Sequence, residues 1–116
     1  MNTPDLTEQF VELIKCASTD LASDVEEALR QARDREAPNS AAQGALDTIL
    51  QNVEASRQTG RPICQDTGTP IFYVWYPQGW SQRQLKEQIT AAVRTATARA
   101  LLRPNAAVSY THLRAH

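Results

Sequence analysis

Apolar side chains recur every three or four residues in four stretches of the chain, which is the period of an amphipathic helix. We therefore predict four helices. The first runs from Pro4 to Ala17 and the second from Leu21 to near Pro38. The third begins at a cap, Asn39 or Ser40, and ends at Thr59 and Gly60, and the fourth runs from a cap at Ser81 to about Leu102. Pro4 suits the first turn of a helix, and Ser81 with Gln84 three residues later forms a capping box.

A different pattern occupies residues 71–76, where β-branched and aromatic side chains follow one another until Pro77 and Gly79 interrupt them. Such a run predicts a strand, and Trp75 and Trp80 are expected to pack beside it. One strand cannot satisfy its own edge hydrogen bonds, so its partners are expected outside this sequence. We predict an α+β fold, mainly helical, with one strand that belongs to a larger sheet.

The composition excludes several classes of protein. With 116 residues, 41% hydrophobic and 22% charged, the chain has the composition of a soluble globular protein of one domain or less. The net charge of -1 is dispersed, so nucleic-acid binding is not expected. No apolar run approaches the roughly 20 residues that span a bilayer, so we expect no membrane partner and a cytoplasmic location.

The two cysteines have different surroundings in the sequence. Without a secretory signal, the pair Cys16 and Cys64 is weak grounds for a disulfide. Cys16 falls at the end of the apolar stripe of the first helix, where a buried thiol is the ordinary occupant.

Cys64 lies in a loop, residues 61–70, that combines a thiol, an amide, a carboxylate and hydroxyls between a helix end and the predicted strand. Pro62 and Pro70 restrict its backbone, and Gly68 allows a positive φ or a close approach. A rigid loop of this kind can carry chemistry, but a polar turn with an incidental cysteine has the same residues. The residues alone leave both interpretations open.

The string Pro-Ile-Cys-Gln-Asp-Thr-Gly-Thr, residues 62–69, closely resembles the cluster loop of class I fumarases and of the alpha subunits of two-component fumarate and L-tartrate dehydratases. The similarity covers most of residues 53–106, including Leu-Arg-Pro-Asn-Ala at residues 102–106, and is fainter before them. It implies that residues 1–106 are a truncated N-terminal part of the alpha region of an iron-sulfur hydro-lyase. Such an enzyme adds or removes water on a small dicarboxylate, with fumarate and malate expected first and tartrate next.

The same resemblance implies roles for single residues. Cys64 would be one of three cysteine ligands of a 4Fe-4S cluster whose fourth iron stays open for substrate, and Cys16 matches neither of the other two. Gln65 and Arg103 would orient substrate carboxylates, while Asp66 would contact the substrate hydroxyl or take part in proton transfer. Without the resemblance, Arg103 is a cation favoured near a helix C-terminus.

The resemblance also implies partners for the chain. A beta subunit or a fused beta domain would complete the enzyme, which would be an oligomer, and the truncated chain would be inactive by itself. Thr67 and Thr69 are expected to make hydrogen bonds within the loop and lie outside the core site.

The last residues, 107–116, form a separate segment in our prediction. Residues 108–116 resemble the conceptual translation of a sequencing adaptor, so we expect a non-native tail without a function. His112 and His116 have the four-residue spacing of a helical metal site, but two histidines without a third ligand are a weak signal.

Two other functions are compatible with the residues. The four amphipathic stripes could belong to a noncatalytic helical interaction domain in which Cys64 is incidental. A redox-sensing cysteine protein is less favoured, because Arg61 is the only cationic residue near Cys64 in the sequence.

Overall fold

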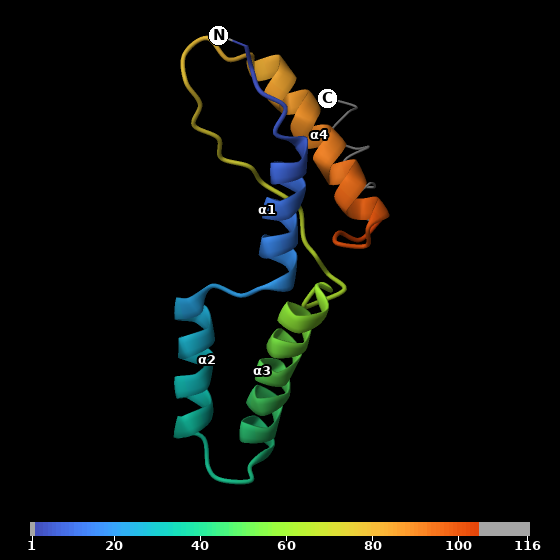
Figure 1. Ribbon diagram of the computed structural model, residues 1–116. Helices are drawn as coiled ribbons and strands as arrows, with labels where there is room; N and C mark the ends of the chain where they lie inside the picture. The colour runs from blue at the N-terminus through green and yellow to red at the C-terminus, as the bar shows by residue number, and fades with distance from the viewer. Residues whose placement is uncertain (1, 105–116) are drawn as a thin grey trace.

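The computed structural model describes residues 2–104, which form four α-helices. The helices are α1 (Thr7–Thr19), α2 (Ser23–Arg35), α3 (Ala41–Thr59) and α4 (Gln82–Ala98). Helix α1 packs beside α4, α2 packs beside α3, and a long connection from α3 runs back past α1 to reach α4 (Figure 1). The radius of gyration is 17.9 Å, well above the roughly 13 Å of a compact 100-residue domain. The two helix pairs therefore form an elongated molecule of 58 × 30 × 26 Å.

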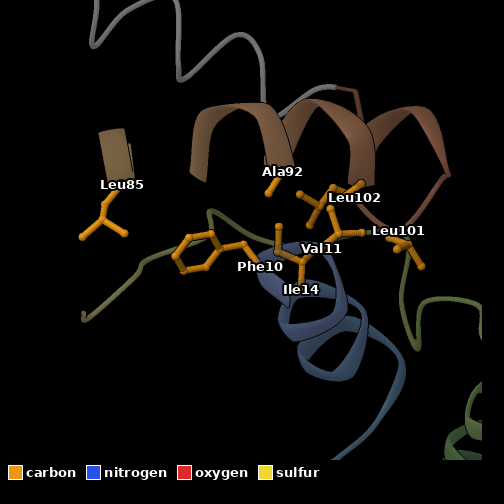
Figure 2. Packing of buried hydrophobic residues seen from close by; sticks show 8 residues of the cluster. Phe10, Val11, Ile14, Leu85, Ala92, Leu101 and Leu102 are labelled. Atoms are coloured by element: carbon orange, nitrogen blue, oxygen red, sulfur yellow. The ribbon is translucent and has the colours of Figure 1, made fainter. Parts of the chain in front are cut away.

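The apolar core lies between α1 and α4. It contains Phe10, Val11 and Ile14 of α1, Leu85, Ala92 and Ala96 of α4, and Leu101 and Leu102 just after α4 (Figure 2). The Phe10 ring meets the Phe72 ring edge to face, with centroids 6.1 Å apart. Full burial of one such aliphatic or aromatic side chain stabilises a fold by about 1.5–3 kcal/mol, so this core is the main apolar contribution in the described chain.

Three predicted helix ends are confirmed. Ser40 caps α3 and accepts the Gln43 N–H at 3.1 Å, and Ser81 caps α4 and accepts the Gln84 N–H at 3.2 Å. Helix α3 ends at Gly60, which adopts the left-handed conformation with φ 67°. Short polar residues and glycine thus mark these ends for the expected physical reasons.

Helix α1 begins later than predicted. Pro4 precedes the helix, which starts at Thr7 and continues to Thr19 instead of ending near Ala17. The Asp5 carboxylate accepts hydrogen bonds from the Thr7 N–H at 3.1 Å and the Thr7 hydroxyl at 2.6 Å. This side chain satisfies an otherwise unpaired donor of the first turn, which displaces the helix start from the proline.

Helix α4 ends at Ala98 and not near Leu102 as the apolar pattern predicted. Ala100 adopts the left-handed conformation with φ 59°, and the Leu101 N–H donates to the Ala96 carbonyl oxygen at 2.9 Å. This is the closing turn that glycine usually makes at a helix end. The turn places Leu101 and Leu102 in the core, and their burial offsets the strain at the alanine.

Residues 2–104 form no strand, so the strand predicted at residues 71–76 does not form within the described chain. Residues 71–76 are an extended segment, and no described strand lies beside it to complete a ladder of hydrogen bonds. Ile71, Tyr73 and Trp75 are 74%, 78% and 87% exposed, so the predicted packing of Trp75 is also wrong. The α+β prediction is right only in being mainly helical.

Two single-residue predictions of burial have different outcomes. Trp80 is half-buried and packs against the core, as expected. Cys16 is exposed, so its predicted burial is wrong. The stripe of α1 that faces α4 includes Ile14. Cys16 lies two positions further, which rotates it by about 200° around the helix and turns it away from α4.

Candidate functional site

The loop that contains Cys64 is attached to two helices just before the cysteine. The Ile63 N–H donates to the Ser18 carbonyl oxygen of α1 at 2.9 Å. The Asn52 side-chain amide of α3 donates to the Ile63 carbonyl oxygen at 2.7 Å. Both backbone groups of Ile63 are therefore satisfied, and they fix the chain where Cys64 begins.

The Cys64 thiol is exposed and accepts one hydrogen bond. The donor is the Asp66 N–H, 3.4 Å from Cys64 Sγ. Backbone N–H contacts to sulfur are one means by which proteins tune iron-sulfur clusters. Exposure on a fixed loop also suits a thiol that must reach a group outside its own chain.

Asp66 connects the cysteine loop to a distant part of the sequence. Its Oδ1 accepts the Gly68 N–H at 3.2 Å, which makes a local turn at a glycine with φ 69°. The same oxygen lies 3.1 Å from Arg103 Nη2 in an ion pair. The structure thus brings the carboxylate beside Cys64 into contact with the arginine after α4.

Arg103 is held by its backbone as well as by its guanidinium. Its N–H donates to Thr67 Oγ1 at 3.1 Å, across 36 positions of sequence. Thr67 was expected to make hydrogen bonds within its own loop, but its partner lies outside it. Arg103 Nε is buried, and no described residue accepts a hydrogen bond from it.

The predicted site residues therefore divide into two groups. Cys64, Asp66 and Arg103 are brought together by contacts, whereas the exposed Gln65 side chain has no hydrogen bond with any described residue. Over residues 2–104, no group of three or more His, Cys, Asp and Glu side chains could hold a metal ion. The described chain has two exposed free thiols, Cys16 and Cys64, and of the two only Cys64 lies in the loop expected to hold the cluster.

Two residues that position the site carry little signal in the sequence. Asn52 occupies a polar position of α3, and the helical period gives no reason to single it out. Ser18 contributes only a backbone oxygen, which no side-chain pattern reveals. Thr67 directly follows the Cys-Gln-Asp string, but nothing in that string indicates its contact with Arg103.

An apolar groove of about 560 Å³ lies beside the site. It is lined by one face of α1, by the extended segment around Phe72, and by Thr67 and Leu102. Leu13 of α1 lines it and is 57% exposed, so the groove is a large uncovered apolar surface of the described chain.

None of the helices within residues 2–104 is long and apolar enough to cross a membrane. The segment predicted to be a non-native tail, with His112 and His116, lies outside the described residues, and that prediction is untested.

Comparison with known proteins identifies the family. Residues 7–114 match the family model described as "Fumarate hydratase (Fumerase)". The chain is 41% identical to "Putative fumarate hydratase class I" of Geobacillus stearothermophilus over 106 residues. These residues are 91% of this chain and 21% of the relative.

Two tartrate dehydratase sequences are also similar. The chain is 31% identical to "Putative L(+)-tartrate dehydratase subunit alpha" of Methanocaldococcus jannaschii, over 86% of this chain and 36% of the relative. It is 32% identical to "L(+)-tartrate dehydratase subunit alpha" of Escherichia coli strain K12, over 87% of this chain and 33% of the relative. The chain thus spans between about a fifth and somewhat over a third of these relatives. These findings show that the chain belongs to the family of class I fumarate hydratases and L-tartrate dehydratase alpha subunits.

Proposed function

We propose that this chain is part of an iron-sulfur hydro-lyase that reversibly adds or removes water on a small dicarboxylate. The observation that carries the proposal is the convergence of Cys64, Asp66 and Arg103 in a family whose named relatives are fumarate hydratases and tartrate dehydratases. An exposed thiol, a carboxylate and a cation are the groups that such a reaction needs from the protein.

Cys64 would supply one of the three cysteine ligands of a 4Fe-4S cluster. Its thiolate is the soft ligand that iron-sulfur clusters prefer, and its exposed position leaves the sulfur accessible. When bound, the cluster would act as a Lewis acid toward the substrate hydroxyl, which is a poor leaving group. The other two ligands would come from parts of the enzyme outside the described residues.

Arg103 would bind a substrate carboxylate. Its ion pair with Asp66 uses Nη2, and the buried Nε has no acceptor among the described residues. An unpaired buried donor costs about 1–3 kcal/mol, so an arriving carboxylate would gain free energy by pairing with this guanidinium. The exposed Gln65 amide is free to donate a second hydrogen bond that fixes the orientation of a dicarboxylate.

Asp66 would contact the substrate hydroxyl and take part in proton transfer. A lone carboxylate would repel a dianionic substrate, but the Arg103 guanidinium 3.1 Å away compensates its charge. The position of Asp66 two residues from Cys64 would place a carboxylate where it can accept a hydrogen bond from the substrate hydroxyl or take up the proton from the neighbouring carbon.

We further propose that residues 1–106 are the native alpha-region part of this chain. Within them, residues 71–76 would pair with strands from the rest of the enzyme. The extended backbone and the exposed side chains of this segment support a strand whose partners lie elsewhere. A beta subunit or a fused beta domain would complete the enzyme as an oligomer, since two of the relatives are named alpha subunits. Fumarate or malate is the proposed substrate and tartrate the alternative, because the relative with 41% identity carries the fumarate hydratase name.

The test is anaerobic reconstitution, with iron and sulfide, of the complete enzyme that contains this segment. We expect a cluster absorbance band and hydration of fumarate in the wild type, and loss of both in Cys64→Ala. Cys16→Ala is the matched control and should keep both, because Cys16 lies outside the site. A wild-type enzyme that stays colourless would contradict the proposal and favour a noncatalytic interaction domain, whose docking surface would be the apolar groove.

A further inference from the structure

We infer that Thr67 is a positioning residue of the proposed site: its hydroxyl fixes the backbone of Arg103 so that the guanidinium faces substrate beside Cys64. This inference rests on the proposed function and adds a residue that neither the sequence pattern nor the names of the relatives assign. The contact that carries it is the hydrogen bond of 3.1 Å from the Arg103 N–H to Thr67 Oγ1.

Arg103 needs such a contact because regular structure does not hold it. Helix α4 ends at Ala98, and the closing turn through Ala100 satisfies the chain only as far as Leu101. Leu102 is buried, but Arg103 is already half-exposed. Pro104 restricts the backbone of Arg103 on one side and the bonded N–H holds it on the other, where a small rotation would displace the end of the long side chain by several times as much.

The ion pair with Asp66 is not sufficient to hold Arg103 in position. The Arg103 and Asp66 side chains are 41% and 68% exposed, and exposed pairs of this kind contribute little to stability. A substrate carboxylate would also compete with Asp66 for the guanidinium. The backbone hydrogen bond is the contact that would persist while the guanidinium changes partner.

Thr67 is itself well placed to act as the support. It follows Asp66, whose carboxylate closes a local turn with the Gly68 N–H at 3.2 Å. The bond between Thr67 and Arg103 is partly buried, where competition from water is weaker than at the surface. The same turn therefore carries Cys64 and Asp66 and, through Thr67, bonds the backbone of Arg103.

The loop contains a matched control. Thr69 is exposed, is two residues away, and makes no hydrogen bond with any described residue. Thr67→Val removes a hydroxyl at nearly constant shape, Thr67→Ser keeps the hydroxyl, and Thr69→Val removes a hydroxyl that holds nothing in the described chain. Comparison of the three variants separates positioning of Arg103 from a general requirement for threonine in the loop.

The functional test uses the complete enzyme, reconstituted anaerobically, with cluster absorbance, kcat and KM for the dicarboxylate as readouts. We expect Thr67→Val to raise KM about tenfold, with a smaller change in kcat and an unchanged cluster band. Thr67→Ser should return KM to within about twofold of the wild type, and Thr69→Val should match the wild type. An unchanged KM in Thr67→Val, or equal damage in Thr67→Ser, would overturn the inference.

A second measurement does not depend on activity. In the 116-residue chain, the Arg103 amide proton should exchange with solvent about tenfold more slowly in the wild type and in Thr67→Ser than in Thr67→Val. An Arg103 amide that exchanges equally fast in the wild type and in Thr67→Val would refute the contact, and with it the inference. If the wild-type enzyme binds no cluster but the amide shows this protection, the proposed function fails while the contact stands.

Discussion

The two helix pairs of this molecule are stabilised in different ways. Between α1 and α4, eight buried apolar residues form one cluster with few polar groups in it. Between α2 and α3, ion pairs of Arg57 and Arg33 cross from helix to helix, α2 has no buried residue, and Val53 is the one buried apolar residue among the described residues of α3. We call these two parts the α1–α4 unit (residues 3–19 and 80–102) and the α2–α3 hairpin (residues 20–60).

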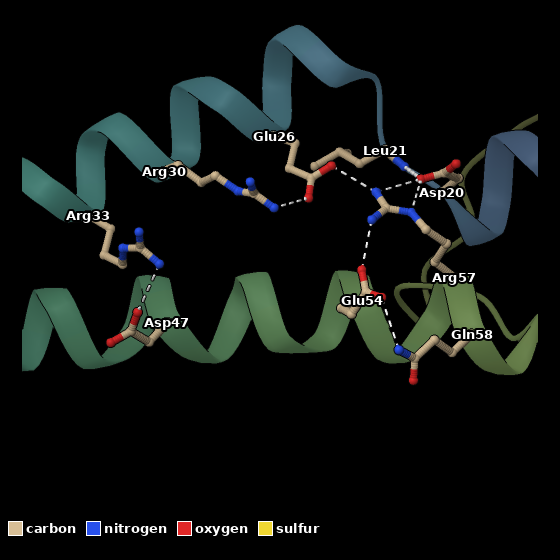
Figure 3. Close-up of polar contacts among 9 residues, drawn as sticks. All are labelled: Asp20, Leu21, Glu26, Arg30, Arg33, Asp47, Glu54, Arg57 and Gln58. Atoms are coloured by element: carbon tan, nitrogen blue, oxygen red, sulfur yellow. Dashed lines mark hydrogen bonds and ion pairs between the residues drawn. The ribbon is translucent and has the colours of Figure 1, made fainter.

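Arg57 is the centre of the α2–α3 hairpin. Its guanidinium lies 3.0 Å from Asp20 before α2, 2.7 Å from Glu26 on α2, and 2.8 Å from Glu54 on its own helix (Figure 3). A second pair, between Arg33 and Asp47, crosses nearer the other end of the hairpin at 3.5 Å. Exposed pairs of this kind contribute little to stability, and Glu26, with 15% of its side chain exposed, is the most shielded member of the network.

The site lies where these two parts meet. Ile63 is bonded on one side to Ser18 of α1 and on the other to Asn52 of α3, so Cys64 follows a junction of the two. Arg103 reaches the same loop from the end of the α1–α4 unit. Apolar burial therefore fixes the Arg103 side of the site, whereas the hairpin supports the Cys64 side through polar contacts.

Truncation of the core should give the largest effect on stability. Ile14 is 4% exposed, and Ile14→Ala should destabilise the α1–α4 unit by about 2–5 kcal/mol through lost burial and a cavity. Chemical denaturation of the 116-residue chain, followed by circular dichroism and by amide exchange in α4, measures the loss. Leu13→Ala is the control, because its side chain is 57% exposed, and should cost far less. Equal losses in the two variants would contradict an apolar core between α1 and α4.

The two helix ends provide a second, smaller comparison. Gly60 ends α3 and Ala100 ends α4, and both adopt φ near +60°, where a Cβ atom is strained. Gly60→Ala should destabilise the hairpin by about 1 kcal/mol, and Ala100→Gly should stabilise the α1–α4 unit by about 0.5–1 kcal/mol. Amide exchange near each helix end measures both changes.

The sign of the two changes is the decisive result. A Cβ at Gly60 would meet Lys15 Cε at 3.6 Å, an ordinary contact, so its cost is expected from the backbone alone. If Ala100→Gly destabilises the chain, then Ala100 is not strained as its φ implies.

The helix ends also show which parts of the fold can be predicted from the sequence. Ser40, Gly60 and Ser81 mark helix ends by local chemistry, and the structure confirms all three. The residue type of Ala100 does not indicate a helix end, so the apolar period predicts a helix through Leu102. Leu101 and Leu102 instead pack in the core beyond the end of α4. Tertiary burial overrode the local pattern there.

The candidate site was predictable in part for a related reason. Cys64, Gln65 and Asp66 are adjacent in the sequence and form a recognisable string, and Arg103 came with the family resemblance. The contacts of Asn52 and Thr67 join residues 11 and 36 positions apart, and no local pattern encodes them. The strand at residues 71–76 was predicted from its side chains, but strand pairing needs a partner, and the described chain has none.

Acidification should distinguish the two parts with the smallest change in stability. The Arg57 hydrogen bond holds the pKa of Glu26 below its ordinary value of 4.5, and the Leu21 N–H and then Arg57 hold the pKa of Asp20 below 3.8. A depressed carboxyl pKa contributes stability that is present above the ordinary value and is lost as pH falls through the lower, folded value. Contacts between α2 and α3 should therefore weaken as pH falls below about 4.5.

Arg57→Met should weaken this pH dependence and the salt dependence of the hairpin, because the Arg57 ion pairs are gone, whereas the Leu21 N–H bond to Asp20 and the Arg33–Asp47 pair remain. The readout must be local, since hydrogen bonds from Thr7 also lower the pKa of Asp5 at the start of α1. Amide exchange in α2, measured at several pH values from about 6 to about 3, isolates the hairpin, and Asp5→Asn is the control that should leave α2 unchanged. If α2 loses protection on acidification equally in the wild type and in Arg57→Met, then the carboxylates around Arg57 do not hold the hairpin. The acid-sensitive contact would then have to involve another carboxylate of the hairpin, such as Asp47 in its pair with Arg33.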